Sequence, residues 1–172
     1  MTEGVGALGL ARKCASAVKA LCEIDGEPTA AQRAAMAGWA GWGPLAPAFA
    51  WQKQGAPWIE IKRQLNEMLD TAQLQQAGNA IDTAFYTPKT VTAAVWEILT
   101  GLGFTGGRVF EPGCGAGYFM AATPPGLDVE WTGVEADEVS AQIAGYLHPQ
   151  AQIIHGRLEK TALRVGSKAG LF

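Results

Sequence analysis

The sequence predicts an α/β protein in which a helical N-terminal region precedes a doubly wound parallel sheet. Near residue 80 the composition changes from Ala-, Gln- and Trp-rich sequence with helical periodicity to short β-branched runs that alternate with helices. Such alternation is typical of parallel sheets. A glycine-rich turn follows the first predicted strand, where these folds bind ligands. We therefore expect a helical region over 1–80 and the sheet domain over 81–172.

Composition excludes several classes of protein. The 172 residues are 48% hydrophobic and 17% charged, which is typical of a globular chain with a buried core. The net charge of -3 provides no overall attraction to nucleic acid. Cys14, Cys22 and Cys114 form no C-x-x-C pair, so we expect reduced thiols and no metal site. The first ten residues do not resemble a signal peptide, and no apolar run approaches the roughly 20 residues of a membrane span. A soluble, cytoplasmic protein is expected.

Three helices are predicted in the first 70 residues. The first has one apolar face with three- and four-residue steps, formed by Leu10, Cys14, Val18, Leu21 and Cys22. Gly26 follows this helix and is expected to end it. Thr29 and Gln32 match a capping box, which predicts a second helix to about Ala37. Pro57 suits the first turn of a third helix.

The turn-prone segment 38–44 carries two large aromatic residues, Trp39 and Trp42. Two interpretations are open. The indoles could form a platform on which nucleic-acid bases stack. Alternatively, they anchor the helical region onto the sheet domain, and this is the interpretation we favour.

The second region alternates helices and strands. Thr87 and Pro88 are expected to cap and start a helix. Its inward residues are expected to be Val91, Val95, Ile98 and Leu99. Further elements are then predicted: a buried strand over 108–110, a short helix after the glycine turn, a strand over 129–134, a helix over 137–147 and a strand over 151–155. His148, directly before Pro149, is expected at the surface.

The glycine turn, Glu111-Pro112-Gly113-Cys114-Gly115-Ala116-Gly117, points to a cofactor site. Glycines allow a sharp turn and leave no Cβ in a ligand's path. A dinucleotide fingerprint, G-x-G-x-x-G, would require glycine at 118, which is Tyr118. Glu135 ends the next strand, where a carboxylate can accept hydrogen bonds from two ribose hydroxyls. The alternative is a simple turn and a solvated acid.

Residues 85–159 resemble the N6-adenine DNA methyltransferases, in particular the large bacterial methylase-helicase proteins. Phe85-Tyr86-Thr87-Pro88 matches the family's F/Y-x-T-P segment, and the turn matches its E/D-x-G-x-G-x-G motif. The segment 36–49 is similar to the G-W-G segment that precedes the methylase domain in these proteins. The resemblance implies a Rossmann-like class I methyltransferase fold that binds S-adenosylmethionine.

The resemblance also implies which residues bind the cofactor. They are Phe85, Tyr86, Thr87, Pro88, Glu111, Pro112, Gly113, Cys114, Gly115, Gly117, Glu135, Ala136 and Leu158. Leu158 could pack on the adenine ring or be an ordinary core leucine. The family often places an acid just after the third strand to contact the adenine amino group. Here Arg157 comes first, so Glu159 would have to supply that carboxylate.

The family's catalytic motif, N-P-P-F/Y, does not occur in this sequence. That motif grips the target adenine in the complete enzymes, so we name no catalytic residue. The sequence ends at Phe172, about where the fourth strand should begin, so we expect a sheet that is incomplete at its C-terminus. The predicted function is the cofactor-binding portion of a DNA adenine-N6 methyltransferase, with DNA as partner by resemblance only. A non-catalytic or partner-completed module, and a methyltransferase for proteins or small molecules, remain open.

Overall fold

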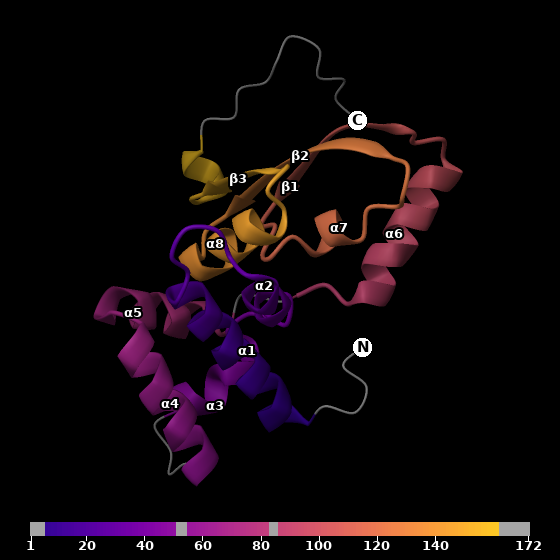
Figure 1. The fold of residues 1–172 in the computed structure, drawn as a ribbon. Helices are drawn as coiled ribbons and strands as arrows, with labels where there is room; N and C mark the ends of the chain where they lie inside the picture. Colours follow the sequence, from indigo (N-terminus) through magenta and orange to yellow (C-terminus); the bar gives the residue numbers. More distant parts are fainter. Residues whose placement is uncertain (1–5, 51–54, 83–85, 162–172) are drawn as a thin grey trace.

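The computed structural model describes residues 6–50, 55–82 and 86–161, and it contains both helices and a parallel sheet (Figure 1). The elements before the sheet are α1 (Ala7–Cys22), α2 (Ala30–Met36), the 3-10 turn η1 (Gly43–Leu45), α3 (Ala46–Phe49), α4 (Ala56–Met68), α5 (Thr71–Ala80) and α6 (Lys89–Gly101). The elements that follow are β1 (Gly106–Pro112), α7 (Tyr118–Ala121), β2 (Asp128–Glu135), α8 (Glu138–Leu147), β3 (Gln152–His155) and the 3-10 turn η2 (Leu158–Lys160). No helix in these ranges is both long and apolar enough to cross a membrane.

The sheet has three parallel strands in the order β1-β2-β3. Glu111 on β1 pairs with Gly133 on β2, and Glu135 on β2 pairs with His155 on β3. This register brings the carboxyl ends of the strands to one edge, where α/β folds bind ligands. The alternation of helix and parallel strand predicted from the sequence is confirmed. The assignment to the class I methyltransferase fold is taken up below.

The sequence signals for the helical region are largely confirmed. Gly26 follows α1 with a left-handed backbone, φ 81°. The capping box at α2 forms as predicted, with Thr29 and Gln32 each accepting a hydrogen bond from the other's backbone N–H. Pro57 lies in the first turn of α4. The short helix α3 and the helix α5, which begins with a second capping box at Asp70, were not predicted from the sequence.

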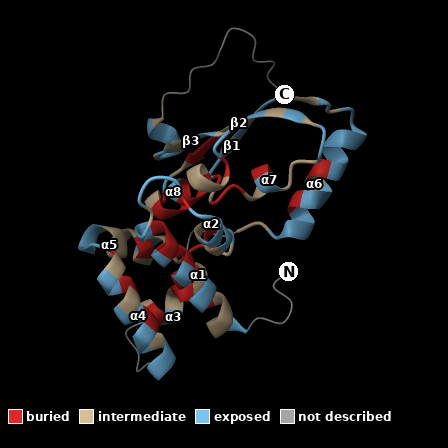
Figure 2. Cartoon of the chain, in the orientation of Figure 1, coloured by how far each residue is buried: buried red, intermediate tan, exposed pale blue. Residues whose placement is uncertain are grey.

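Helix α8 joins the helical region to the sheet (Figure 1). Its residues Val139 and Ile143 belong to the same core cluster as Val18 of α1 and Met36 of α2. Figure 2 shows this buried material concentrated on α1 and α8. Because one core contains residues from both halves of the chain, the division into domains at residue 80 stays a prediction.

Two predictions for α6 are wrong. The helix begins at Lys89, and Pro88 is its N-cap with an extended backbone, so Thr87 does not cap it. The packed face is also rotated relative to the prediction. The buried residues are Thr92 and Trp96, whereas the predicted inward residues are largely exposed: Val91 47%, Ile98 61% and Leu99 37%, with Val95 half-buried. The reason is Trp96, the largest side chain of the helix, which packs edge-on against Trp131 with ring centroids 5.9 Å apart.

Strand β1 is not the buried strand that the sequence predicted. Phe110 is 41% exposed and Arg108 is exposed. Within the described ranges β1 pairs with β2 alone and so forms one edge of the sheet. Val109 packs against the cluster of Trp96 and Trp131, whereas Arg108 and Phe110 point to the other face, which is exposed. Helix α6 and its C-cap also carry an apolar stripe with helical spacing, formed by Val91, Val95, Ile98 and Leu102. Figure 2 shows the exposed outer side of α6.

Candidate cofactor site

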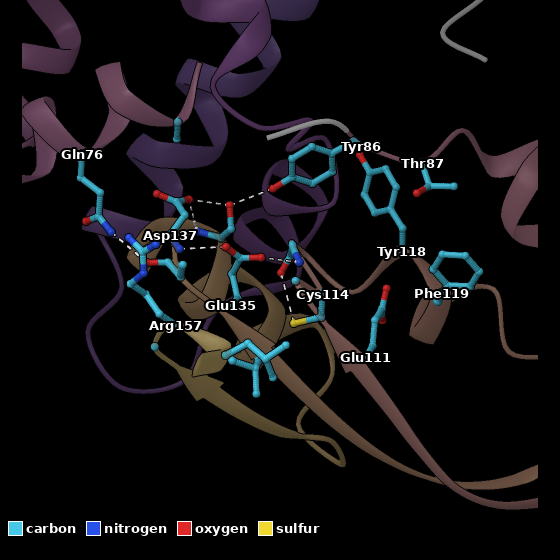
Figure 3. Close-up of a pocket in the computed structure, with 18 of the residues that line it drawn as sticks. Gln76, Tyr86, Thr87, Glu111, Cys114, Tyr118, Phe119, Glu135, Asp137 and Arg157 are labelled. Atoms are coloured by element: carbon cyan, nitrogen blue, oxygen red, sulfur yellow. Dashed lines mark hydrogen bonds between the residues drawn. The ribbon is translucent and has the colours of Figure 1, made fainter. Parts of the chain in front are cut away.

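A cleft of about 820 Å³ opens at the carboxyl ends of the strands. It is lined by Gln76, Asn79, Ala80, Tyr86, Thr87, Glu111, Gly113, Cys114, Gly115, Tyr118, Phe119, Val134, Glu135, Ala136, Asp137, Ser140, Gly156, Arg157, Leu158 and Glu159. Figure 3 shows Glu135 beside Asp137, and Glu111 below Tyr118 and Phe119. The lining thus combines the ends of β1 and β2, residues that follow β3, and residues from the helical region.

The glycine loop has the geometry that its sequence predicts. Gly113, Gly115 and Gly117 all have left-handed φ values, 71°, 54° and 79°, which other residues adopt at a cost. The amide nitrogens of Gly113 and Cys114 donate to the carbonyl oxygen of Val134 at 2.7 and 3.0 Å. The loop is therefore held against the end of β2 and presents backbone, not side chains, to the cleft.

Glu135 braces this loop. Its Oε2 accepts a hydrogen bond from the Gly115 amide at 2.7 Å, and its Oε1 accepts one from the Asp137 amide at 2.8 Å. Each carboxylate oxygen can accept a second hydrogen bond. Glu135 can therefore hold the loop and still accept bonds from vicinal hydroxyl groups in the cleft.

Glu111 is a half-buried acid with unused hydrogen-bonding capacity. Its Oε2 is buried and has no hydrogen-bond partner in the described parts of the chain. Burial, followed by the negative charge of Glu135, raises the pKa of Glu111 from 4.5 to about 7. An unsatisfied buried carboxylate is costly, so this position favours a ligand that brings a cation or an N–H donor.

The charge of the cleft bears on which ligand it can hold. Its acidic lining residues are Glu111, Glu135, Asp137 and Glu159. Arg157 lines the same cleft and is paired with Glu159, with Nε and Oε1 2.6 Å apart. A pyrophosphate would meet like charge here, whereas a cationic group would be attracted. The described residues contain no group of three or more His, Cys, Asp or Glu side chains that could hold a metal ion.

The tryptophans of the 38–44 segment are anchors, as we favoured from the sequence. Trp39 and Trp42 are 0% and 1% exposed, which leaves no face for base stacking. Trp42 Nε1 donates to Asp137 Oδ1 at 2.9 Å. Trp39 Nε1 lies 3.0 Å from both Tyr86 Oη and Ser140 Oγ. Both indoles thus bind residues that line the cleft.

The structure brings together most of the predicted cofactor residues. Those that line the cleft are Tyr86, Thr87, Glu111, Gly113, Cys114, Gly115, Glu135, Ala136 and Leu158. Pro88, Pro112 and Gly117 do not line it and lie in adjoining backbone. Phe85 lies outside the described residues.

Cys114 is not a nucleophile in this setting. It is 4% exposed, and burial raises the pKa of its thiol to about 12, with the charges of Glu135 and Glu111 acting in the same direction. A thiol with so high a pKa is protonated at neutral pH and unreactive. Its place in the loop is therefore structural.

Two side chains differ from expectation. Leu158 is 45% exposed beside the cleft, so it is not an ordinary core leucine, and a planar ligand could pack on it. His148 is 7% exposed rather than at the surface, and burial lowers its pKa. A Cβ on Gly117 would lie 2.5 Å from the His148 ring, so His148 packs against the end of the loop.

Helix α5 contributes cleft residues that the sequence analysis missed. Gln76, Asn79 and Ala80 line the cleft, and Gln76 Nε2 donates to the Ala136 carbonyl at 2.9 Å. The signal was present in Asp70 and Gln73, which repeat the capping-box spacing of α2. The helix itself has only Ala77 buried, so it carries no apolar stripe that would have revealed it.

Comparisons with known proteins complete this description. No protein-family profile matches the chain. Over 79 residues, 46% of its length, it is 34% identical to the "Defense against restriction protein B" of Escherichia phage P1, of which the match covers 3%. It is also similar to a crystal structure from Listeria monocytogenes assigned as a class I S-adenosylmethionine-dependent methyltransferase, with 12% identity, a TM-score of 0.44 and coverage of 92% of this chain and 54% of the other. The chain is therefore similar to a small part of a restriction-defence protein.

Proposed function

We propose that the chain is the S-adenosylmethionine-binding portion of a DNA adenine-N6 methyltransferase with a class I fold. The observation that carries the proposal is the pair of acids, Glu111 and Glu135, which flank a left-handed glycine loop at the ends of adjacent parallel strands. Glu111 suits the ammonium group of the methionine part, and Glu135 suits the ribose hydroxyls. When bound, the cofactor supplies an activated methyl group on a sulfonium cation.

The same geometry argues against a nicotinamide or flavin dinucleotide. The cleft is lined by four acids and one paired arginine, which disfavours a pyrophosphate. Tyr118 occupies the position of the third fingerprint glycine, and its hydroxyl donates to the Trp39 carbonyl at 2.6 Å. That glycine normally permits close packing of helix and strand, which a tyrosine side chain prevents.

Fewer observations support DNA as the substrate than support the cofactor. It is supported by the F/Y-x-T-P and G-W-G segments and by the partial similarity to a phage protein named for defence against restriction. Restriction acts on DNA, so we favour DNA over a protein or small molecule.

Calorimetric titration of the chain with S-adenosylhomocysteine, the demethylated product, tests the cofactor site. We expect micromolar or weaker binding by the wild type and none by Gly115→Val. A Cβ on Gly115 would lie 3.1 Å from the Tyr86 ring, and the φ of 54° is one that L side chains rarely adopt. Gly126→Val is the matched control, because Gly126 also has a positive φ, 89°, but faces open space. Binding retained by Gly115→Val, with the variant folded by circular dichroism, would place the ligand elsewhere.

The second candidate is a module whose sheet is completed by further polypeptide. It is favoured by the exposed edge of β1 and by the apolar stripe on α6. Parallel sheets are normally covered on both faces, whereas Arg108 and Phe110 of β1 are exposed here. We expect the chain alone to transfer no tritiated methyl group to mixed-sequence duplex DNA. Transfer that appears only when a chain bearing N-P-P-F/Y is added would support this candidate, whereas transfer by the chain alone above the Glu135→Ala background would contradict it.

A further inference from the structure

Tyr86 lies between the helical region and the glycine loop. A Cβ on Gly41 would come within 2.3 Å of one edge of the Tyr86 ring, and a Cβ on Gly115 within 3.1 Å of the other. The two glycines thus leave a slot that the ring fills. Gly41 belongs to the segment that carries Trp39 and Trp42, and Gly115 belongs to the loop.

A hydrogen-bonded chain fixes the Tyr86 hydroxyl in this slot. The Ser140 hydroxyl donates to Asp137 Oδ2 at 2.5 Å, since a carboxylate can only accept. Tyr86 Oη must then donate to Ser140 Oγ, at 2.8 Å. Trp39 Nε1 donates to the same two oxygens at 3.0 Å. Each acceptor oxygen in this hydrogen-bond network therefore receives a bond from Trp39 of the helical region or from Ser140 of α8.

The segment 39–42 also contacts Tyr118, which lines the cleft beside Tyr86. The Tyr118 hydroxyl donates to the Trp39 carbonyl at 2.6 Å, and the Tyr118 ring packs edge-on against Tyr86 with centroids 5.2 Å apart. Trp42 Nε1 donates to Asp137. Residues 39–42 therefore contact four side chains that line the cleft: Tyr86, Tyr118, Asp137 and Ser140.

We infer that the segment 39–42 is a positioning element of the cleft, and that Gly41 is glycine because it seats Tyr86 against the glycine loop. The helical region then positions side chains that line the cleft, through residues 39–42. The inference rests on the proposed function only where it treats residues 113–117 as a cofactor-binding loop. The packing of Tyr86 on the loop can be tested without any ligand.

Hydrogen–deuterium exchange read by mass spectrometry tests it on Gly41→Ala. The matched control is Gly26→Ala, because Gly26 has nearly the same φ, 81° against 79°, but nothing within 4 Å of its Cβ. The loop amides are hydrogen-bonded to Val134 and Glu135 in the wild type, so they should exchange slowly. In Gly41→Ala we expect the loop peptide 113–117 to exchange several-fold faster, with helix α4 unchanged. In Gly26→Ala we expect no change in the loop.

Two results would overturn the inference. One is loop exchange in Gly41→Ala equal to that in Gly26→Ala. The other is equal acceleration in the loop and in α4, which would indicate a general loss of stability. If Gly41→Ala does not fold, Tyr86→Ala provides the same test by removing the ring, and unchanged loop exchange there would equally refute it.

A ligand arm separates this inference from the proposed function. S-adenosylhomocysteine should bind Gly41→Ala at least several-fold more weakly than Gly26→Ala. Absence of binding by the wild type, together with faster loop exchange in Gly41→Ala alone, would refute the proposed cofactor and leave the positioning role intact. Equal binding by both variants would refute the positioning role.

Discussion

The two flanks of the sheet differ in how completely they are packed. On the side of β2 and α8, Val134, Ile143 and Trp42 are at most 1% exposed, and the buried polar groups of Asp137 and Ser140 are hydrogen-bonded. On the side of β1 and α6, Ile98 and Leu102 are 61% and 81% exposed. The cleft is lined from both flanks, by Glu111 at the end of β1 and by Asp137 and Ser140 beside β2. The contrast indicates that β2 and α8 share a covered core, while the flank at α6 presents apolar surface.

The largest effect is expected from Trp42→Ala. This change removes a fully buried aromatic side chain and the donor to Asp137, so we expect a loss of roughly 3–5 kcal/mol in the free energy of unfolding. Urea denaturation measures it. Trp42→Phe keeps most of the packing and should lose less. A loss from Trp42→Ala no greater than that from Leu102→Ala would contradict the packing contrast.

Glu111→Gln should change the pH dependence of stability. The pKa of Glu111 is raised to about 7 in the folded chain. Between pH 4.5 and about pH 7, therefore, the folded chain holds a proton on Glu111 that the unfolded chain has lost. Wild-type stability therefore falls as pH rises through this window. The variant should lack this fall. Between pH 5 and pH 8, its free energy of unfolding should therefore rise relative to that of the wild type by on the order of 2 kcal/mol, a value reduced for the partial exposure of Glu111.

Urea unfolding at both pH values provides the measurement for Glu111. Glu130→Gln, which alters an exposed carboxylate on β2, is the control. If the difference in free energy of unfolding between Glu111→Gln and wild type does not vary with pH, the pKa of Glu111 is not raised in the folded chain.

The smallest effect is expected on the exposed flank. Ile98→Ala should change the free energy of unfolding by less than about 0.5 kcal/mol, since the side chain is 61% exposed. The same substitution at the fully buried Ile143 should cost about 2–5 kcal/mol. Equal losses from the two variants would show that α6 is packed in solution, and light scattering would then reveal whether a second copy covers it.

The geometry around the cleft was predicted best where its signals are local in sequence, while the binding roles of its residues stay a prediction. The glycine loop and Glu135 were found because their chemistry is encoded within a strand, a turn and the end of the next strand. The rotation of α6 was not, because its apolar stripe runs through Val95, whereas its buried face consists of Thr92 and Trp96. Only tertiary neighbours such as Trp131 decide which face is buried.

Long-range contributions to the site could not be read from sequence. Gln76 reaches the cleft across 60 residues of chain, and Tyr86 is seated by Gly41, which no periodicity connects to it. The two tryptophans were assigned as anchors on size and context, but their partners, Asp137 and Ser140, depend on the packing of α8. The covalent order of a chain specifies its local turns more directly than it specifies such contacts.

The central claim is that this cleft binds S-adenosylmethionine through Glu135. Calorimetry with S-adenosylhomocysteine on wild type, Glu135→Ala and Glu135→Gln tests it most directly. We expect wild type to bind, Glu135→Ala to lose roughly 1.5–3 kcal/mol, and Glu135→Gln, which keeps one acceptor oxygen, to lose less. Equal affinity in wild type and Glu135→Ala, or tighter binding of a nicotinamide dinucleotide than of S-adenosylhomocysteine, would contradict the claim.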